Sequence, residues 1–180
     1  MRYPTIAICL MSASAAIADC PPPPDIAAVQ DRLLAQIKVA PNESSARQIS
    51  SQLWDLWSRA PDERAQEMLE RGVKAHAAFD FDTAIEAFDE LVVYCPDYAE
   101  GYNQRAFVNF LRQNYATALV DLDLAIDRSP KHVAAISGKA LTLMGLGRDD
   151  EAQEVLRFAL SMNPWLAERR YLVEKPGQEL

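Results

Sequence analysis

A fixed sequence period runs through most of the chain, and it limits the available folds more than any other feature. When the sequence is shifted by the interval that separates Pro96 from Pro130, small and apolar residues coincide through three consecutive copies without an insertion. The six matching columns are Met68/Tyr102/Ile136, Gly72/Ala106/Ala140, Ala84/Ala118/Ala152, Phe88/Leu122/Leu156, Leu91/Ala125/Ala159 and Pro96/Pro130/Pro164. A constant period of this length is typical of proteins built from stacked repeats.

Each column has a physical role in a helix–turn–helix unit. Gly72 and its counterparts are small because a partner helix is expected to cross closely there, and Ala84 has the same role on the second helix. Phe88 lies four residues after Ala84, so both residues share one helical face, and Phe88 can fill the space between units. Pro96 ends the second helix, because proline lacks the amide donor that a helix interior requires. The pattern therefore predicts three pairs of helices.

A 34-residue unit with a small residue, then Ala-x-x-x-Phe, then Pro resembles the tetratricopeptide repeat. The resemblance covers residues 65–166 and divides them into repeats at 65–98, 99–132 and 133–166. It implies an exported bacterial member of that family. It also implies an all-α fold, a right-handed superhelical solenoid of helix–turn–helix repeats with capping helices at its N- and C-terminal ends.

Two polar features accompany the repeats. Asp97 and Glu100 have the spacing of a capping box, which predicts Asp97 as the N-cap of a first helix. Arg105 stands in a column where the family usually has Leu, and we expect it to pair with Asp121 on the facing helix of its own repeat. Such a pair is structural by default.

The flanking segments predict caps for the two ends of the solenoid, which need them for solubility. Residues 25–64 are interpreted as an N-terminal capping helix pair that resembles a degenerate repeat, with helices over 25–40 and from 44 or 45 to 59. Residues 167–180 are interpreted as a C-terminal capping helix and tail. That final helix is expected over 165–174, with frayed residues beyond it.

The first residues have the pattern of a secretory signal peptide. Residues 1–18 begin with the positive Arg2, continue as an uncharged apolar run, and end with a small-x-small cleavage site. Residues 19–24 then form a Pro-rich linker. This pattern predicts a periplasmic protein without membrane insertion in its mature form. An alternative is a lipoprotein anchored at Cys20, although Asp19 stands where the lipid-attachment motif has a small neutral residue.

Two cysteines remain after the signal peptide is removed, Cys20 and Cys95. An even pair in an oxidising compartment permits a disulfide. Such a bond would close a long loop and stabilise the fold by restricting the unfolded chain. The alternative is a buried Cys95 that acts as a small apolar residue and a free Cys20 thiol. We favour the alternative, because nothing in the sequence fixes the distance between the two residues.

Composition and charge argue against several classes of function. The 18 Lys and Arg residues face 26 Asp and Glu residues, a net charge of −8 without a basic cluster, which disfavours nucleic acids and anionic membranes. Six glycines and two histidines offer little for phosphate loops or metal sites. His132 follows a proline in a turn, where a solvated histidine is expected. The sequence therefore predicts no catalytic residue, no metal ligand and no cofactor.

The resemblance implies a concave groove lined by the first helix of each repeat. Carried over position by position, the groove residues are Leu69, Val73, His76, Asn103, Gln104, Phe107, Phe110, Leu141 and Met144. A largely apolar surface of this kind suits an amphipathic helix or a short extended peptide. Phe107 and Phe110 have an alternative role in packing between repeats. Some family members clamp C-terminal carboxylates with basic residues, and the matching positions here lack them: Leu69, Val73, Gln104, Ala134 and Gly138.

These observations predict a non-catalytic protein–protein interaction module, an adaptor or scaffold in the periplasm with a protein or peptide partner. The first alternative is a self-associating structural protein, a homo-oligomer that uses the groove or the tryptophans Trp54, Trp57 and Trp165. The second alternative is a lipid-anchored envelope assembly factor. A third is an enzyme with an acidic cleft site at Glu70 or Glu100.

Overall fold

The structure, a computed structural model, describes residues 19–173, so the expected signal peptide and the last residues of the tail lie outside the described residues. Within that range the chain is helical and has no strand. The elements are α1 (Ala27–Lys38), α2 (Glu43–Trp57), α3 (Glu63–Ala77), α4 (Phe81–Tyr94), α5 (Ala99–Leu111), α6 (Tyr115–Arg128), α7 (Val133–Gly145), α8 (Asp149–Met162) and the 3-10 helix η1 (Ala167–Tyr171). None of these described helices combines the length and apolar character that a bilayer crossing requires.

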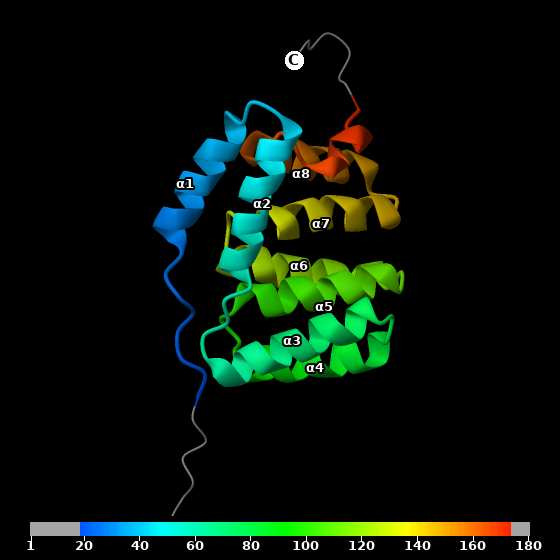
Figure 1. The fold of residues 1–180 in the computed structure, drawn as a ribbon. Helices are drawn as coiled ribbons and strands as arrows, with labels where there is room; N and C mark the ends of the chain where they lie inside the picture. The colour runs from blue at the N-terminus through cyan, green and yellow to red at the C-terminus, as the bar shows by residue number, and fades with distance from the viewer. Residues whose placement is uncertain (1–18, 174–180) are drawn as a thin grey trace, which may run out of the picture.

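Helices α3 to α8 form three antiparallel pairs stacked one on another (Figure 1). The interval between the starts of α5 and α7 equals the sequence period, and α4, α6 and α8 start at the same interval. Each helix packs mainly against the helices before and after it. The prediction of an all-α solenoid is confirmed.

The small residue of the column Gly72/Ala106/Ala140 permits a close helix crossing in repeat 1. Phe88 is fully buried, and its ring lies so near α3 that a Cβ atom on Gly72 would come within 2.4 Å of it. In the next repeats the same position is an alanine, and Ala106 and Ala140 are both fully buried. The predicted role of the column, close helix crossing, agrees with this packing.

We expect Gly72→Ala to lower the free energy of unfolding by about 1–2 kcal/mol, because overpacking against Phe88 outweighs the better helix propensity of alanine. Gly138→Ala is the matched control, since its Cβ would meet only the flexible end of Leu122 at 3.2 Å. Urea unfolding monitored by circular dichroism measures both. A Gly72→Ala variant as stable as the Gly138→Ala variant would contradict this packing.

An ion-pair network links the first two repeats. Arg105 donates two hydrogen bonds to Asp121 on α6, at 2.9 and 2.6 Å, and one to Asp89 on α4, at 2.7 Å. The predicted pair with Asp121 is therefore confirmed. Hydrogen bonding to Asp121 raises the pKa of the Arg105 guanidinium above its already high normal value. A permanent cation on α5 thus joins the second helices of two neighbouring repeats.

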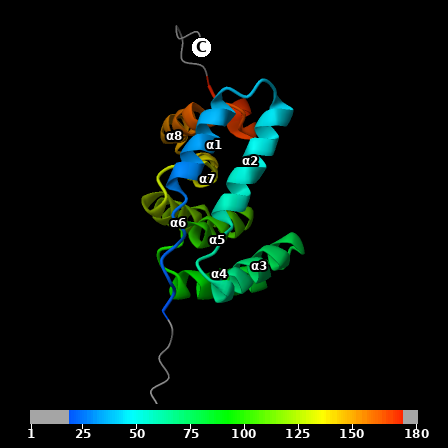
Figure 2. The ribbon, with the colours of Figure 1, turned by 60° about the vertical axis from the view of Figure 1, so that its left-hand side comes forward.

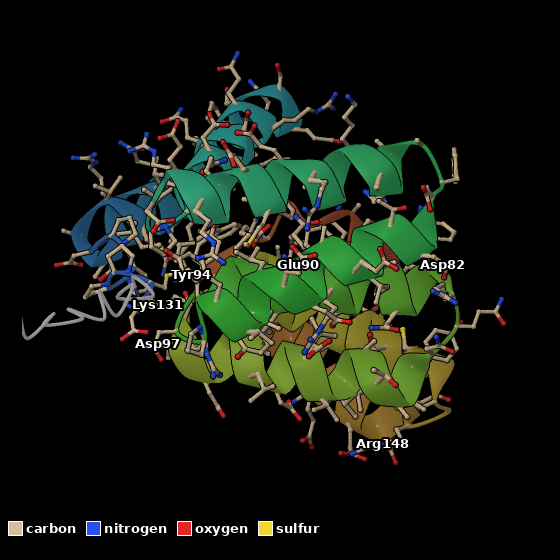
Figure 3. All side chains as sticks on the ribbon, turned by 90° about the horizontal axis from the view of Figure 1, so that it is seen from below. Asp82, Glu90, Tyr94, Asp97, Lys131 and Arg148 are labelled. Atoms are coloured by element: carbon tan, nitrogen blue, oxygen red, sulfur yellow. A yellow bond between two sulfur atoms is a disulfide. The ribbon has the colours of Figure 1, made fainter. Side chains whose placement is uncertain are left out.

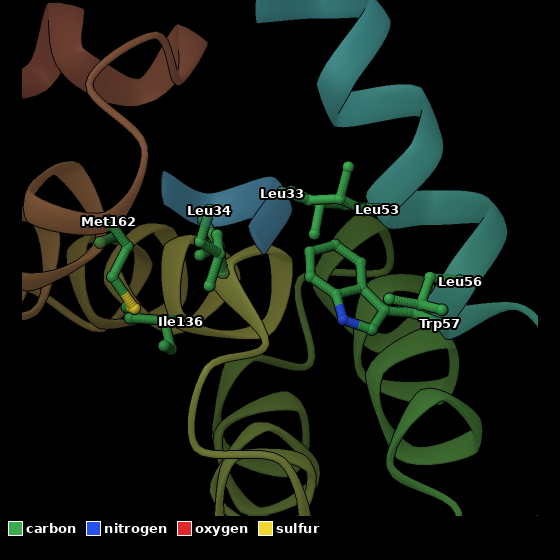
Figure 4. Packing of buried hydrophobic residues seen from close by; sticks show 9 residues of the cluster. Leu33, Leu34, Leu53, Leu56, Trp57, Ile136 and Met162 are labelled. Atoms are coloured by element: carbon green, nitrogen blue, oxygen red, sulfur yellow. The ribbon is translucent and has the colours of Figure 1, made fainter. Parts of the chain in front are cut away.

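The N-terminal helix pair does not extend the stack as a degenerate repeat would. Instead, α1 and α2 form a hairpin that runs along the stack, across the repeat helices, and α1 packs against α8 (Figures 1 and 2). One buried cluster joins the hairpin to the last repeat, with Leu33, Leu34, Leu53, Leu56 and Trp57 on one side and Val133, Ile136, Ala159 and Met162 on the other (Figure 4). The apolar face of the pair is thus buried against repeat 3.

A disulfide joins Cys20 to Cys95, so the interpretation with a free Cys20 thiol, which the sequence favoured, differs from the structure. The reason is the direction of the hairpin. Because α1 starts near the α6–α7 turn, where Lys131 pairs with Asp31 at 2.6 Å, the segment before α1 leads back along the stack to the end of α4 (Figure 1). Cys95 is the C-cap residue of α4 and is buried there.

The C-terminal cap is a 3-10 helix of five residues, shorter than the final helix expected over 165–174. The side-chain amide of Gln153 on α8 donates to the carbonyl of Tyr171 at 2.9 Å and accepts from the amide of Val173 at 2.8 Å. These bonds hold the chain against α8 in an extended conformation after Tyr171, which ends the helix early.

Candidate functional site

A groove of about 340 Å³ lies along the first helices of the three repeats. Val73 and His76 reach it from α3, Gln104 and Phe107 from α5, and Leu141 from α7. The pairs on α3 and α5 have the spacing of about one helical turn, so their side chains share the concave face. Trp54 of α2 and Glu168 of η1 also line the groove. Its lining is mostly apolar.

Most of the groove residues expected from the sequence line this groove. They are Val73, His76, Asn103, Gln104, Phe107, Phe110 and Leu141. Leu69 does not, because it is only 3% exposed and belongs to the core around Phe88. Met144, near the end of α7, is not among the lining residues either. The predicted groove is thus shifted away from the start of α3 and from the end of α7.

Phe107 is the most prominent apolar side chain of the groove. It is 44% exposed, and its ring packs edge to face against His76 with 5.1 Å between ring centroids. Phe110 is more buried and packs against Tyr115 at 5.5 Å, so it belongs both to the groove and to the core. Exposed aromatic side chains on a concave surface are typical anchors for a bound segment.

Two lining residues from outside the repeats, on α2 and η1, were missed from the sequence. Trp54 is 42% exposed and packs edge to face on Trp57 at 5.8 Å. Glu168 reaches the groove from η1. The spacing of Trp54 and Trp57 places both on one side of α2 and could have marked that side as packed. No local signal, however, places α2 or η1 beside the repeats.

A buried carboxyl group orients two of the polar residues that line the groove. Glu100, which is 1% exposed, accepts hydrogen bonds from the side-chain amide of Asn103 at 3.0 Å and from that of Gln104 at 2.6 Å. The predicted capping box is wrong, because α5 starts after Tyr98 without a side-chain cap and Glu100 is used in this network. Asp97 is therefore not the N-cap.

His132 is also part of this network and is not solvated, contrary to the sequence interpretation. It is 1% exposed, its ring stacks on Trp57 with 4.1 Å between centroids, and its Nε2 lies 2.9 Å from Glu100. Its Nδ1 accepts from the backbone amide of Ala135 and so caps α7. Because Nδ1 accepts, Nε2 carries the proton and donates to Glu100.

The same network attaches the hairpin to the repeats. Tyr98 donates its hydroxyl to the backbone carbonyl of Trp57 at 2.8 Å, and the Trp57 indole donates to Gln30 of α1 at 2.8 Å. Burial, assisted by the charge of Glu100, raises the pKa of the Tyr98 phenol well above its normal value, so this donor keeps its proton. The wall that carries Trp54 is thus fixed to the start of α5.

Neither acid considered for an enzyme lies in the groove lining. Glu70 is exposed on α3 and accepts from Gln66 at 3.0 Å, and Glu100 is enclosed by its partners. In the part of the chain that the structure describes, no group of three or more His, Cys, Asp or Glu residues could hold a metal ion.

Comparison with known proteins finds relatives that cover most of the chain. A TPR repeat-containing protein of Rhizobium etli is 29% identical over 119 residues, 66% of this chain and 58% of that protein. Tetratricopeptide repeat protein 36 of Xenopus tropicalis is 32% identical over 126 residues, 67% of this chain and 61% of that protein. The mouse protein of the same name is 30% identical, with 67% of both chains covered. The chain belongs to the tetratricopeptide repeat family.

Other comparisons agree on the fold. The TPR2B domain of yeast Sti1, solved in a complex with an Hsp70 peptide, superposes with a TM-score of 0.57 at 24% identity, over 61% of this chain and 90% of that domain. MamA matches with a TM-score of 0.53 over 84% of this chain and 83% of that protein, at 19% identity. No family model matches the sequence. The chain spans about three fifths of the length of the Rhizobium and Xenopus relatives.

Within the tetratricopeptide repeat family, this chain differs at the positions that clamp carboxylates in some members. Val73, Gln104, Ala134 and Gly138 stand at four of these positions and line the groove, and Leu69 stands at the fifth and is buried. None of the five carries a positive charge. This tetratricopeptide repeat groove therefore lacks the cations with which those members bind a carboxylate.

Proposed function

We propose that the chain is a non-catalytic adaptor module that holds a segment of a partner protein in the concave groove. The observation that carries this proposal is an open, mostly apolar groove in which the aromatic side chain of Phe107 is 44% exposed. Aromatic residues that a partner can cover in such a concave site are enriched among binding anchors. The peptide complexes of Sti1 and of the first TPR domain of Spaghetti (RPAP3) support the use of such a surface for a peptide.

We place the mature protein in the periplasm. The N-terminal sequence has the pattern of a secretory signal peptide, and the disulfide between Cys20 and Cys95 favours an oxidising compartment. The same bond argues against the lipoprotein alternative, because lipid attachment requires the Cys20 sulfur that the disulfide uses.

Phe107→Asp is expected to weaken partner binding by about 30-fold or more, since an anchor aromatic contributes roughly 2 kcal/mol and a carboxylate would replace it. The measurement uses 12-residue peptides selected from a random displayed library on the folded chain, with affinities determined by fluorescence anisotropy. Because Phe107 is already partly exposed, the fold should survive the substitution.

Val120→Asp is the matched control, since Val120 is 59% exposed on α6 and does not line the groove. The control should bind the selected peptides as the unmodified chain does. If the library yields no peptide, or if Phe107→Asp binds the peptides as well as Val120→Asp does, the groove is not the binding site.

A further inference from the structure

The charged and polar groups of the groove favour one kind of segment. Among residues 19–173, its lining includes the carboxyl group of Glu168 and one histidine, His76, but no lysine or arginine. The chain as a whole carries a net charge of −8. An acidic segment entering this groove would meet a like charge and no cation to compensate for its lost hydration.

The two amides beside the groove are oriented by the buried Glu100. Asn103 and Gln104 turn their side-chain NH2 groups toward Glu100 and donate to its two carboxyl oxygens, at 3.0 and 2.6 Å. Their carbonyl oxygens then point away from Glu100, and within residues 19–173 no protein group donates to them. No buried side-chain oxygen in this range lacks a partner, so neither of these oxygens is fully buried, and both residues line the groove.

The polar part of the groove lining therefore consists of amide groups that can accept hydrogen bonds and a carboxyl group, that of Glu168. We propose that the groove selects a basic amphipathic segment, with aromatic or aliphatic side chains against Phe107 and a lysine or arginine directed at Gln104, Asn103 and Glu168. This inference rests on the proposed function and adds the chemistry of the partner. The same acceptors and the carboxyl group of Glu168 disfavour a segment that binds through a terminal or side-chain carboxylate.

The test uses the composition of peptides from the random 12-residue library that bind in a Phe107-dependent manner. Lysine and arginine should outnumber aspartate and glutamate by about threefold or more in these peptides. Exchanging the lysine of a selected peptide for glutamate should weaken its binding about tenfold. Amidation of its C-terminus should leave binding unchanged or strengthen it.

Charge variants of the chain test the same proposal by changing the groove instead of the peptide. Glu168→Gln should weaken the basic peptide about threefold and Glu168→Lys about tenfold, with less effect at high salt. Glu86→Lys is the control, because it makes the same change in net charge on the exposed side of α4. If Glu168→Lys and Glu86→Lys lost equal affinity for the peptide, the effect would come from net charge alone, and the proposed contact would be overturned.

The outcomes separate this inference from the proposed function. Selected peptides that depend on Phe107 but are acidic, or that require a free carboxylate, would overturn the inference and leave the groove as the binding site. An absence of Phe107-dependent peptides would overturn both. Basic peptides that respond to both Phe107→Asp and Glu168→Lys support both.

Discussion

Replacing Cys20 and Cys95 together by alanine should lower the free energy of unfolding by about 4 kcal/mol, the value expected for releasing a loop of this size. The bond spans a sequence separation of 75, and the loop contains the whole α1–α2 hairpin. Without the bond the unfolded chain gains conformational freedom, whereas the hairpin contacts of the folded state stay available.

Urea unfolding of the oxidised chain and of the double alanine variant measures this difference. Alanine is chosen because Cys95 is buried, where a serine hydroxyl would add a separate cost. The unmodified chain under reducing conditions is the second control and should approach the variant. Identical midpoints for the oxidised chain and the variant would show that the bond contributes nothing to stability.

The Glu100→Ala variant is expected to be less stable by about 3 kcal/mol, because loss of the Glu100 carboxyl group leaves buried donors without their common acceptor. Three side chains lose a partner, namely Asn103, Gln104 and His132. Because His132 stacks on Trp57, we also expect the hairpin to loosen from the repeats, with a change in tryptophan fluorescence before global unfolding.

Glu90→Ala is the matched control for Glu100→Ala. Glu90 pairs with Arg71 at 2.6 Å, but both side chains are about half exposed, and Glu90 lies on the outside of α4 (Figure 3). Exposed ion pairs of this kind contribute less than about 1 kcal/mol. If the two variants lost equal stability in urea unfolding, the buried network around Glu100 would have no special role.

The repeats could be predicted from the sequence because their determinants are local. Gly72 and Phe88 belong to one helix pair, and the second helix of each repeat is followed by its own proline, so a constant period specifies the packing of the whole stack. Most of the groove followed from the same register, since helical spacing alone brings Val73, Phe107 and Leu141 to one face.

The rest of the site depends on contacts distant in sequence. Trp57 ends α2 and His132 precedes α7, and the two rings meet only because the hairpin folds along the stack. Nothing near His132 in the sequence distinguishes a solvated turn histidine from one that donates to Glu100. The disulfide was underestimated for the same reason, because the position of Cys20 depends on the direction of the hairpin.

The central claim, that a partner protein occupies the groove, is tested most directly by site-specific photo-crosslinking in the exporting cell. A benzophenone amino acid replaces Phe107 in the groove, and the same probe replaces Glu86, which is exposed on α4, as the control. We expect a discrete adduct with a different protein from position 107 only, displaced by a selected library peptide. No adduct, equal adducts from both positions, or an adduct of twice the mass of the chain would contradict the claim.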